Sequence, residues 1–327
     1  LSDAEAVRAV WLNPRPRADS VVFAPDLRYA PRRVIGAGFA IDGDYGPLGW
    51  VGLTDRRMFH DRVEGALRGT LGEFRQDIEL SARRAYENPE FEASPIVGLT
   101  YGHEQVRLFA PNGDELPRST IPDIREVVLR FGWEVPFGPR FGLRSGAVAR
   151  RWLGDPAAPG VTYASGLAAR LTGSWPAQRR TLVADAEATT AYIRATVVAS
   201  ALLERGRLKL TPTLRAAWMN EQAPPHLRLP LGDRDGFAGL RIGERLGVAQ
   251  LYAATDASWG LFGPIDAVVS VMVGQSALDA GRPLAGDWIT GARLGLGAET
   301  PVGPLRLQYG FNDAQRNLWF LRLGRWF

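Results

Sequence analysis

A two-residue hydrophobic period runs through long segments of this chain, and it constrains the fold more than any other feature. In GRLKLTPTLRAAWM, residues 206–219, the even positions from Leu208 to Trp218 are apolar, and the odd positions from Arg207 to Arg215 are charged or carry a hydroxyl. Because successive side chains of a strand point to opposite faces, this pattern predicts a strand with one apolar and one polar face. The same alternation recurs in residues 126–135, 288–299 and 305–311.

Two all-β architectures fit this alternation: a soluble β-sandwich and a transmembrane β-barrel. The alternating segments run for about 10–14 residues, whereas strands of soluble proteins are usually about 5–6 residues long. Their polar faces carry charge and glycine at mid-strand, as a wet lumen allows, and aromatic residues gather at the segment ends. The pattern therefore favours the transmembrane barrel, in antiparallel arrangement, over the sandwich.

Composition excludes several other classes. The 327 residues are 46% hydrophobic and 23% charged, which disfavours disorder, and the 37 glycines and 23 prolines indicate many turns. No run of about 18 apolar residues exists that could form a spanning helix. The net charge is +4, but the arginines are scattered singly and Lys209 is the one lysine, so the basicity does not indicate nucleic-acid binding. The chain has no cysteine, which fits a cell-envelope protein.

The turn signals predict sixteen strands, and bacterial single-chain barrels have an even number. The predicted strands are 32–41, 46–56, 62–72, 74–85, 93–103, 123–136, 139–153, 160–173, 178–188, 190–204, 206–219, 246–258, 265–277, 287–299, 303–312 and 317–327. Short links such as PFGP (136–139) alternate with longer polar ones such as residues 110–122, which is the asymmetry of outer-membrane barrels. One short helix is also predicted over residues 2–11, with Ser2 as its N-cap.

Residues 220–245, NEQAPPHLRLPLGDRDGFAGLRIGER, form the longest connection, and a connection of this length is often functional. Here the sequence resembles the BamA-like outer-membrane assembly and secretion barrels, a superfamily that includes BamA, TamA, two-partner-secretion transporters and patatin-linked translocators. Their long loop after strand eleven folds into the lumen and carries a VRGF/Y motif. The matching stretch here is GLRIGE, although two of its residues replace the usual Gly-aromatic pair: Gly239, Leu240, Arg241, Ile242, Gly243 and Glu244.

Two further stretches carry the resemblance. GLGAETPVGPLRLQYGF (295–311) is similar to the family's fourteenth and fifteenth strands with their turn, and residues 46–72 are similar to its second and third strands. In the family, an aspartate of the thirteenth strand pairs with the loop arginine, but residues 265–277 have no aspartate at that point. Inward-facing acids elsewhere are therefore the candidate partners of Arg241, because a guanidinium in a partly wet lumen favours a carboxylate. These candidates are Glu299, Glu134 and Glu126.

The chain ends on NLWFLRLGRWF, whose alternate positions form an apolar stripe with one interruption at Arg325. The resemblance implies that this run closes the barrel wall and is read as an assembly signal, carried by Trp319, Leu321, Leu323 and Phe327. It also implies a weak lateral seam between the first and last strands. The first predicted strand contains Gly36 and Gly38, and interior glycines weaken strand pairing.

Enzyme motifs are not recognisable. A serine-hydrolase G-x-S-x-G is missing, since GQSAL (274–278) fails at its last position, and His60, His103 and His226 lack metal-ligand spacing. GAGFAIDG (36–43) lacks the G-x-G-x-x-G pattern of a nucleotide site. We therefore expect no enzyme activity, no cofactor and no metal site.

These observations together predict a sixteen-stranded barrel over residues 31–327, preceded by a periplasmic lead-in or plug segment at residues 1–30 that is too short for a POTRA domain. The resemblance implies an outer-membrane location and a role in inserting, assembling or translocating polypeptides. Its expected partners are outer-membrane lipid, client polypeptides and a fused or partner periplasmic domain, and an oligomer is compatible with it. The alternatives are a barrel that anchors or exports a patatin-like lipase, and a passive porin or structural barrel.

Overall fold

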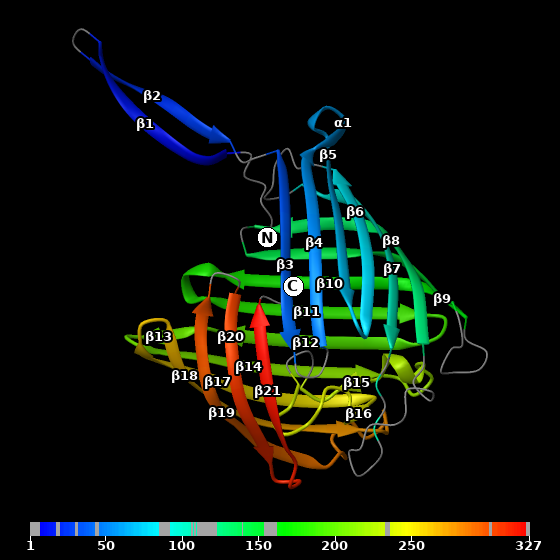
Figure 1. The fold of residues 1–327 in the computed structure, drawn as a ribbon. Coiled ribbons are helices and arrows are strands. Elements are labelled where there is room, and N and C mark those ends of the chain that lie inside the picture. The colour runs from blue at the N-terminus through cyan, green and yellow to red at the C-terminus, as the bar shows by residue number, and fades with distance from the viewer. Residues whose placement is uncertain are drawn as a thin grey trace.

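A closed antiparallel barrel dominates the fold (Figure 1). The computed structural model describes residues 7–17, 20–29, 32–42, 46–84, 92–105, 107, 109, 123–138, 140–153, 162–232, 236–300 and 303–324. The wall strands are β3 (Arg33–Asp42), β4 (Gly46–Arg57), β5 (Val63–Gly72), β6 (Arg75–Arg84), β7 (Ser94–Gln105), β8 (Asp123–Phe137), β9 (Phe141–Leu153), β10 (Tyr163–Trp175), β11 (Arg180–Thr189), β12 (Ile193–Ala201) with β13 (Leu203–Arg205), β14 (Leu208–Met219), β17 (Ala249–Phe262), β18 (Ile265–Ala277), β19 (Trp288–Thr300), β20 (Gly303–Asn312) and β21 (Asn317–Gly324).

The predicted sixteen-stranded barrel is confirmed, since β12 and β13 both pair with β14 and together fill one position of the wall. Short helical turns are also present: α1 (Met58–Asp61), η2 (Pro176–Gln178) and η3 (Pro225–Leu227). Two further short strands, β15 (Leu229–Pro230) and β16 (Leu246–Gly247), pair with each other inside the long connection. Within the described residues, no helix is long and apolar enough to cross a membrane.

The chain before the barrel forms a separate hairpin of β1 (Val7–Arg17) and β2 (Ser20–Tyr29), which projects from the end of the barrel where β3 begins (Figure 1). The helix predicted over residues 2–11 is therefore wrong for its described part, which is strand. Val7, Val10 and Trp11 have high strand propensity, and this segment pairs in register with β2. The extended backbone continues through the two prolines of β1.

Along each strand, side chains alternate between the lumen and the outer surface, as the two-residue period predicts. On β19, Ile289 and Arg293 are buried and face inward, while Trp288, Leu294 and Leu296 are exposed on the outer surface. Strands β8, β14 and β20 divide in the same way. The outer wall is thus apolar although it is exposed, which is the arrangement of a barrel surrounded by lipid.

Exposed aromatic side chains mark two levels on the outer wall. The three longest connections all leave the same end of the barrel, which we call the loop end, and the opposite end is the turn end. Near the loop end the exposed aromatic residues of the wall strands are Phe39, Tyr101, Tyr163, Trp288, Phe311 and Trp319; near the turn end they include Trp133, Phe137, Trp259 and Phe262. Such paired belts are typical of the two membrane interfaces.

Two facing glycines let neighbouring strands of the wall approach closely. Gly132 of β8 lies directly opposite Gly146 of β9. A Cβ atom on Gly132 would lie 2.8 Å from the Gly146 Cα, and one on Gly146 would lie 2.4 Å from the Gly132 Cα. Only glycine permits this approach, so neither position can carry a side chain.

Candidate functional site

The connection between β14 and β17 packs on the inner face of the wall. Four of its side chains, Leu231, Phe237, Ala238 and Leu240, form one buried cluster with Tyr252, Ala254, Met272 and Ile289 of β17, β18 and β19. The ring of Phe237 is fully buried and meets Tyr252 edge to face at 6.2 Å. Glycines of the wall make room for it, because a Cβ on Gly291 would lie 3.1 Å from the Phe237 ring. We call this connection, residues 220–248, the inward loop.

Polar contacts also hold the backbone of the inward loop against the part of the wall that contains β17 to β20. The Asn312 side-chain amide donates to the Ala238 carbonyl at 2.9 Å, and the Gln250 amide donates to the Pro230 carbonyl at 2.8 Å. The Ala238 N–H lies 3.0 Å from the Met272 sulfur. Buried backbone N–H and C=O groups outside helices and sheets need such hydrogen-bond partners. These contacts therefore specify one path for the loop.

The loop motif Gly239–Glu244 lies against the turn that precedes the closing strand. Glu244 accepts a hydrogen bond from the Arg241 backbone N–H at 3.0 Å and forms an ion pair with Arg316 at 3.0 Å. The Glu244 side chain is only 8% exposed. Gly239 has φ +73°, and a Cβ there would lie 2.5 Å from the Arg316 carbonyl oxygen, so a glycine is required at this point. The motif therefore joins the inward loop to the turn between β20 and β21.

The other half of the inward loop packs on the inner face of the strands from β8 to β14. Ala223 and Leu229 of the loop belong to a buried cluster with Trp152 of β9 and Tyr192 of the turn between β11 and β12. His226 meets the Trp152 ring edge to face at 5.6 Å. β9 and β19 are separated by seven strand positions in a wall of sixteen. The inward loop thus crosses the barrel from one side to the other.

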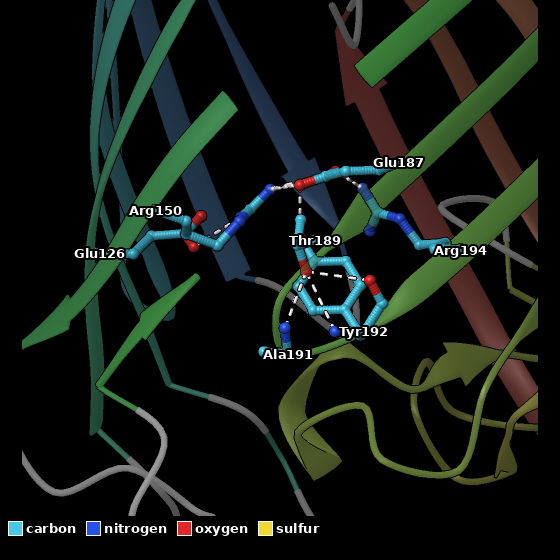
Figure 2. Close-up of polar contacts among 7 residues, drawn as sticks. All are labelled: Glu126, Arg150, Glu187, Thr189, Ala191, Tyr192 and Arg194. Carbon is cyan, nitrogen blue, oxygen red and sulfur yellow. Dashed lines mark hydrogen bonds and ion pairs between the residues drawn. The ribbon is translucent and has the colours of Figure 1, made fainter. Parts of the chain in front are cut away.

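A buried ion-pair network holds the wall beside this second cluster (Figure 2). Arg150 of β9 pairs with Glu126 of β8 at 2.7 Å and with Glu187 of β11 at 3.3 Å. Glu187 also pairs with Arg194 of β12 at 3.0 Å and accepts a hydrogen bond from the Tyr192 hydroxyl. The Arg150 and Glu187 side chains are 6% and 7% exposed, so the network satisfies charges that burial would otherwise penalise.

The candidate partner acids of Arg241 lie on the wall, and two of them form ion pairs with strand arginines. Glu126 pairs with Arg150, and Glu134 pairs with Arg83 at 3.4 Å and Arg144 at 3.2 Å. Glu299 is exposed near the turn end of β19. The pairing of Arg241 with one of these acids stays a prediction. The sequence reasoning did not identify Arg316 and Asn312, because neither belongs to a recognisable motif and their contacts join residues far apart in the chain.

The closing seam between β21 and β3 is short. Within the described residues it has three register pairs, Arg322 with Asp42, Leu323 with Ile41 and Gly324 with Ala40. β20 and β21, by comparison, are in register from Leu305 to Phe311. Trp319, Leu321 and Leu323 face outward as the stripe predicts, whereas Phe327 and Arg325 lie outside the described residues.

Trp50 of β4 covers the two predicted seam glycines from the lumen. A Cβ on Gly38 would lie 2.4 Å from the indole nitrogen, and a Cβ on Gly36 would lie 3.2 Å from the six-membered ring. The two glycines therefore make room for an aromatic ring that packs across β3. Their role in a labile seam stays a prediction.

The three histidines lie apart: His60 is in α1, His103 is in β7 and His226 is in η3 of the inward loop. The predicted lack of enzyme activity is untested by this arrangement and stays a prediction.

Comparison with known proteins identifies similar folds. No protein-family model matches the sequence, and none of the curated proteins matches it. The structure is similar to BamA from Haemophilus ducreyi lacking POTRA domains 1-3, with a TM-score of 0.69 and 12% identity over 98% of this chain and 75% of that one. CdiB from Escherichia coli gives 0.66 and 13% over 98% and 68%, and CdiB from Acinetobacter baumannii gives 0.61 and 12% over 98% and 65%. The predicted likeness to BamA-like barrels is thus confirmed at the level of the fold.

Proposed function

We propose that this chain is an outer-membrane barrel that inserts, assembles or translocates other polypeptides. The seam between β21 and β3, with three register pairs among the described residues, carries the proposal, because an edge held by few backbone hydrogen bonds can open and offer its N–H and C=O groups to an incoming strand. The fold that the chain shares with BamA and CdiB supports the same reading. The two aromatic belts and the apolar outer wall support the membrane location.

The inward loop has a place in this mechanism. It crosses the lumen near the loop end, and its Glu244 contacts Arg316 at the start of the closing strand. Loop position and seam geometry are therefore physically linked, so that a client entering the lumen could change both. A passive porin needs an open water path, which a crossing loop obstructs, so we favour the polypeptide-handling function over the porin.

A disulfide across the seam tests the function. Ile41 and Leu323 are register partners on β3 and β21, and the chain has no native cysteine. In lipid vesicles, we expect the unmodified chain to accelerate the folding of a small urea-unfolded outer-membrane barrel severalfold over empty vesicles. The oxidised Ile41→Cys, Leu323→Cys variant should lose that acceleration, and reduction should restore it.

The matched control places the same bond in an ordinary strand pair. Leu305 and Leu323 are register partners on β20 and β21, so the Leu305→Cys, Leu323→Cys variant restrains the closing strand without locking the seam. It should keep full activity when oxidised. Full activity of the seam-locked protein would overturn opening at this seam, and no acceleration by the unmodified chain would count against polypeptide insertion itself.

A further inference from the structure

Basic side chains gather at one place on the outer wall. Arg125 of β8 and Arg151 of β9 face outward near the loop end, and His103 of β7 lies beside them. On the described strands, every other outward-facing position in the loop-end half of the wall is uncharged, apart from Asp123 in the same cluster. The four residues His103, Asp123, Arg125 and Arg151 are called the basic cluster below.

Strand register fixes the level of the basic cluster relative to the aromatic belt. Tyr101, Val127, Arg151 and Tyr163 are successive register partners across β7, β8, β9 and β10. Arg151 therefore lies in the same row as two exposed belt tyrosines. Arg125 lies two residues closer to the loop end, which is about 7 Å along a strand. Because belt aromatics sit at the headgroup level, the two guanidinium groups lie at and just beyond that level.

The guanidinium groups are near enough to share one ligand. Arg125 is opposite Leu153, so Arg151 is its diagonal neighbour, and diagonal neighbours on one face are about 7–8 Å apart. His103 is directly opposite Arg125. Asp123 contacts the His103 ring and lies 3.4 Å from the Arg125 guanidinium, which orients both groups. Among the described residues, the side chain of Arg151 has no carboxylate partner.

Outer-membrane barrels have their longer loops on the extracellular side, which places the loop end at the outer leaflet. We propose that the basic cluster binds a phosphate group of a glycolipid in that leaflet. Arginine binds phosphate through a planar fork of two hydrogen bonds, and an arginine that faces lipid without a counter-ion is unfavourable. The two guanidinium charges of the cluster face only the one carboxylate of Asp123, and a phosphate balances the excess at the level where lipid phosphates lie. The inference rests on the proposed outer-membrane location and adds a lipid ligand to it.

Binding of lipid A to the purified chain in a non-ionic detergent tests the proposal. Native mass spectrometry should detect retained diphosphorylated lipid A on the unmodified protein. The Arg125→Gln, Arg151→Gln variant should retain about tenfold less, because it loses two charge-assisted contacts. Lipid A with the same acyl chains but no phosphate should bind weakly to both proteins. Excess inorganic phosphate should not remove the lipid, because the acyl chains also bind the wall.

Arg180 provides the matched control, since it is an exposed, outward-facing arginine at the turn end of β11. The Arg180→Gln variant should retain lipid A as the unmodified protein does. Equal retention of phosphorylated and dephosphorylated lipid A, or an equal loss in both variants, would overturn the proposal. Heat-modifiable migration in gels verifies that each variant is folded. Because the assay needs no client polypeptide, its failure is distinguishable from failure of the seam experiment.

Discussion

At the scale of single residues, we expect His226 to make the packing of the inward loop depend on pH. Burial beside Trp152, together with the positive charge of Arg150, lowers the pKa of His226 to about 4, although Glu126 acts in the opposite direction. The packed loop therefore favours the neutral ring, and a released loop regains the ordinary value of 6.5. The packed position of the loop is therefore most stable above pH 6.5, and this stability is lost as the pH falls towards 4.

We expect loop release to become more favourable by up to about tenfold for each pH unit in this window. Hydrogen–deuterium exchange of peptides from residues 220–248, corrected for intrinsic rates, should be faster at pH 5 than at pH 7.5. The His226→Gln variant should lack this dependence while peptides from β19 behave alike in both proteins. A pH dependence that persists in His226→Gln would assign it to another group.

At the scale of elements, the ion pair between Glu244 and Arg316 joins the inward loop to the closing strand. The Glu244→Gln variant keeps an acceptor for the Arg241 N–H but removes the charge that Arg316 contacts. We expect loop anchoring to weaken by about 1–3 kcal/mol, since a largely buried charged contact is lost. Limited trypsin digestion should then cleave faster after loop arginines such as Arg228 and Arg245.

The matched control lies in the same loop. Glu221 accepts a hydrogen bond from the Ala280 N–H, is exposed, and has no ion pair among the described residues. Glu221→Gln should leave the digestion rate unchanged. If Glu244→Gln also leaves it unchanged, the contact does not anchor the loop.

The elements also show what the sequence could predict. The wall strands were predicted from the two-residue period, which a strand between lipid and lumen requires, and from the turn signals between them, and the predicted ranges agree with the observed ones within a few residues. No such period indicated the interruption at Leu202, which separates β12 from β13, or the contacts of Arg316. The inward loop lacks periodicity, and its partners are set by which distant strands the closed barrel brings beside it. The pairing of Arg241 with a wall acid was inferred from a resemblance and stays a prediction.

At the scale of the whole molecule, the loop that crosses the barrel should limit ion flow. In planar bilayers we expect small, flickering openings from the unmodified chain, because the loop contacts both β9 and β19 sides of the lumen. The Glu244→Gln variant should open more often, and Glu221→Gln should not. A large, steady conductance in the unmodified protein would instead indicate a porin.

The crossing loop also has a mechanical consequence. A cylinder held only by strand pairing can flatten under lateral pressure, but a tie between opposite walls fixes its width along one direction. Here the inward loop joins wall strands from β8 to β19, and the seam between β21 and β3 lies on the arc that the loop does not contact. Pressure from the surrounding bilayer should therefore deform the barrel mainly on the seam side, and bilayer thickness or tension would then adjust how readily that side yields.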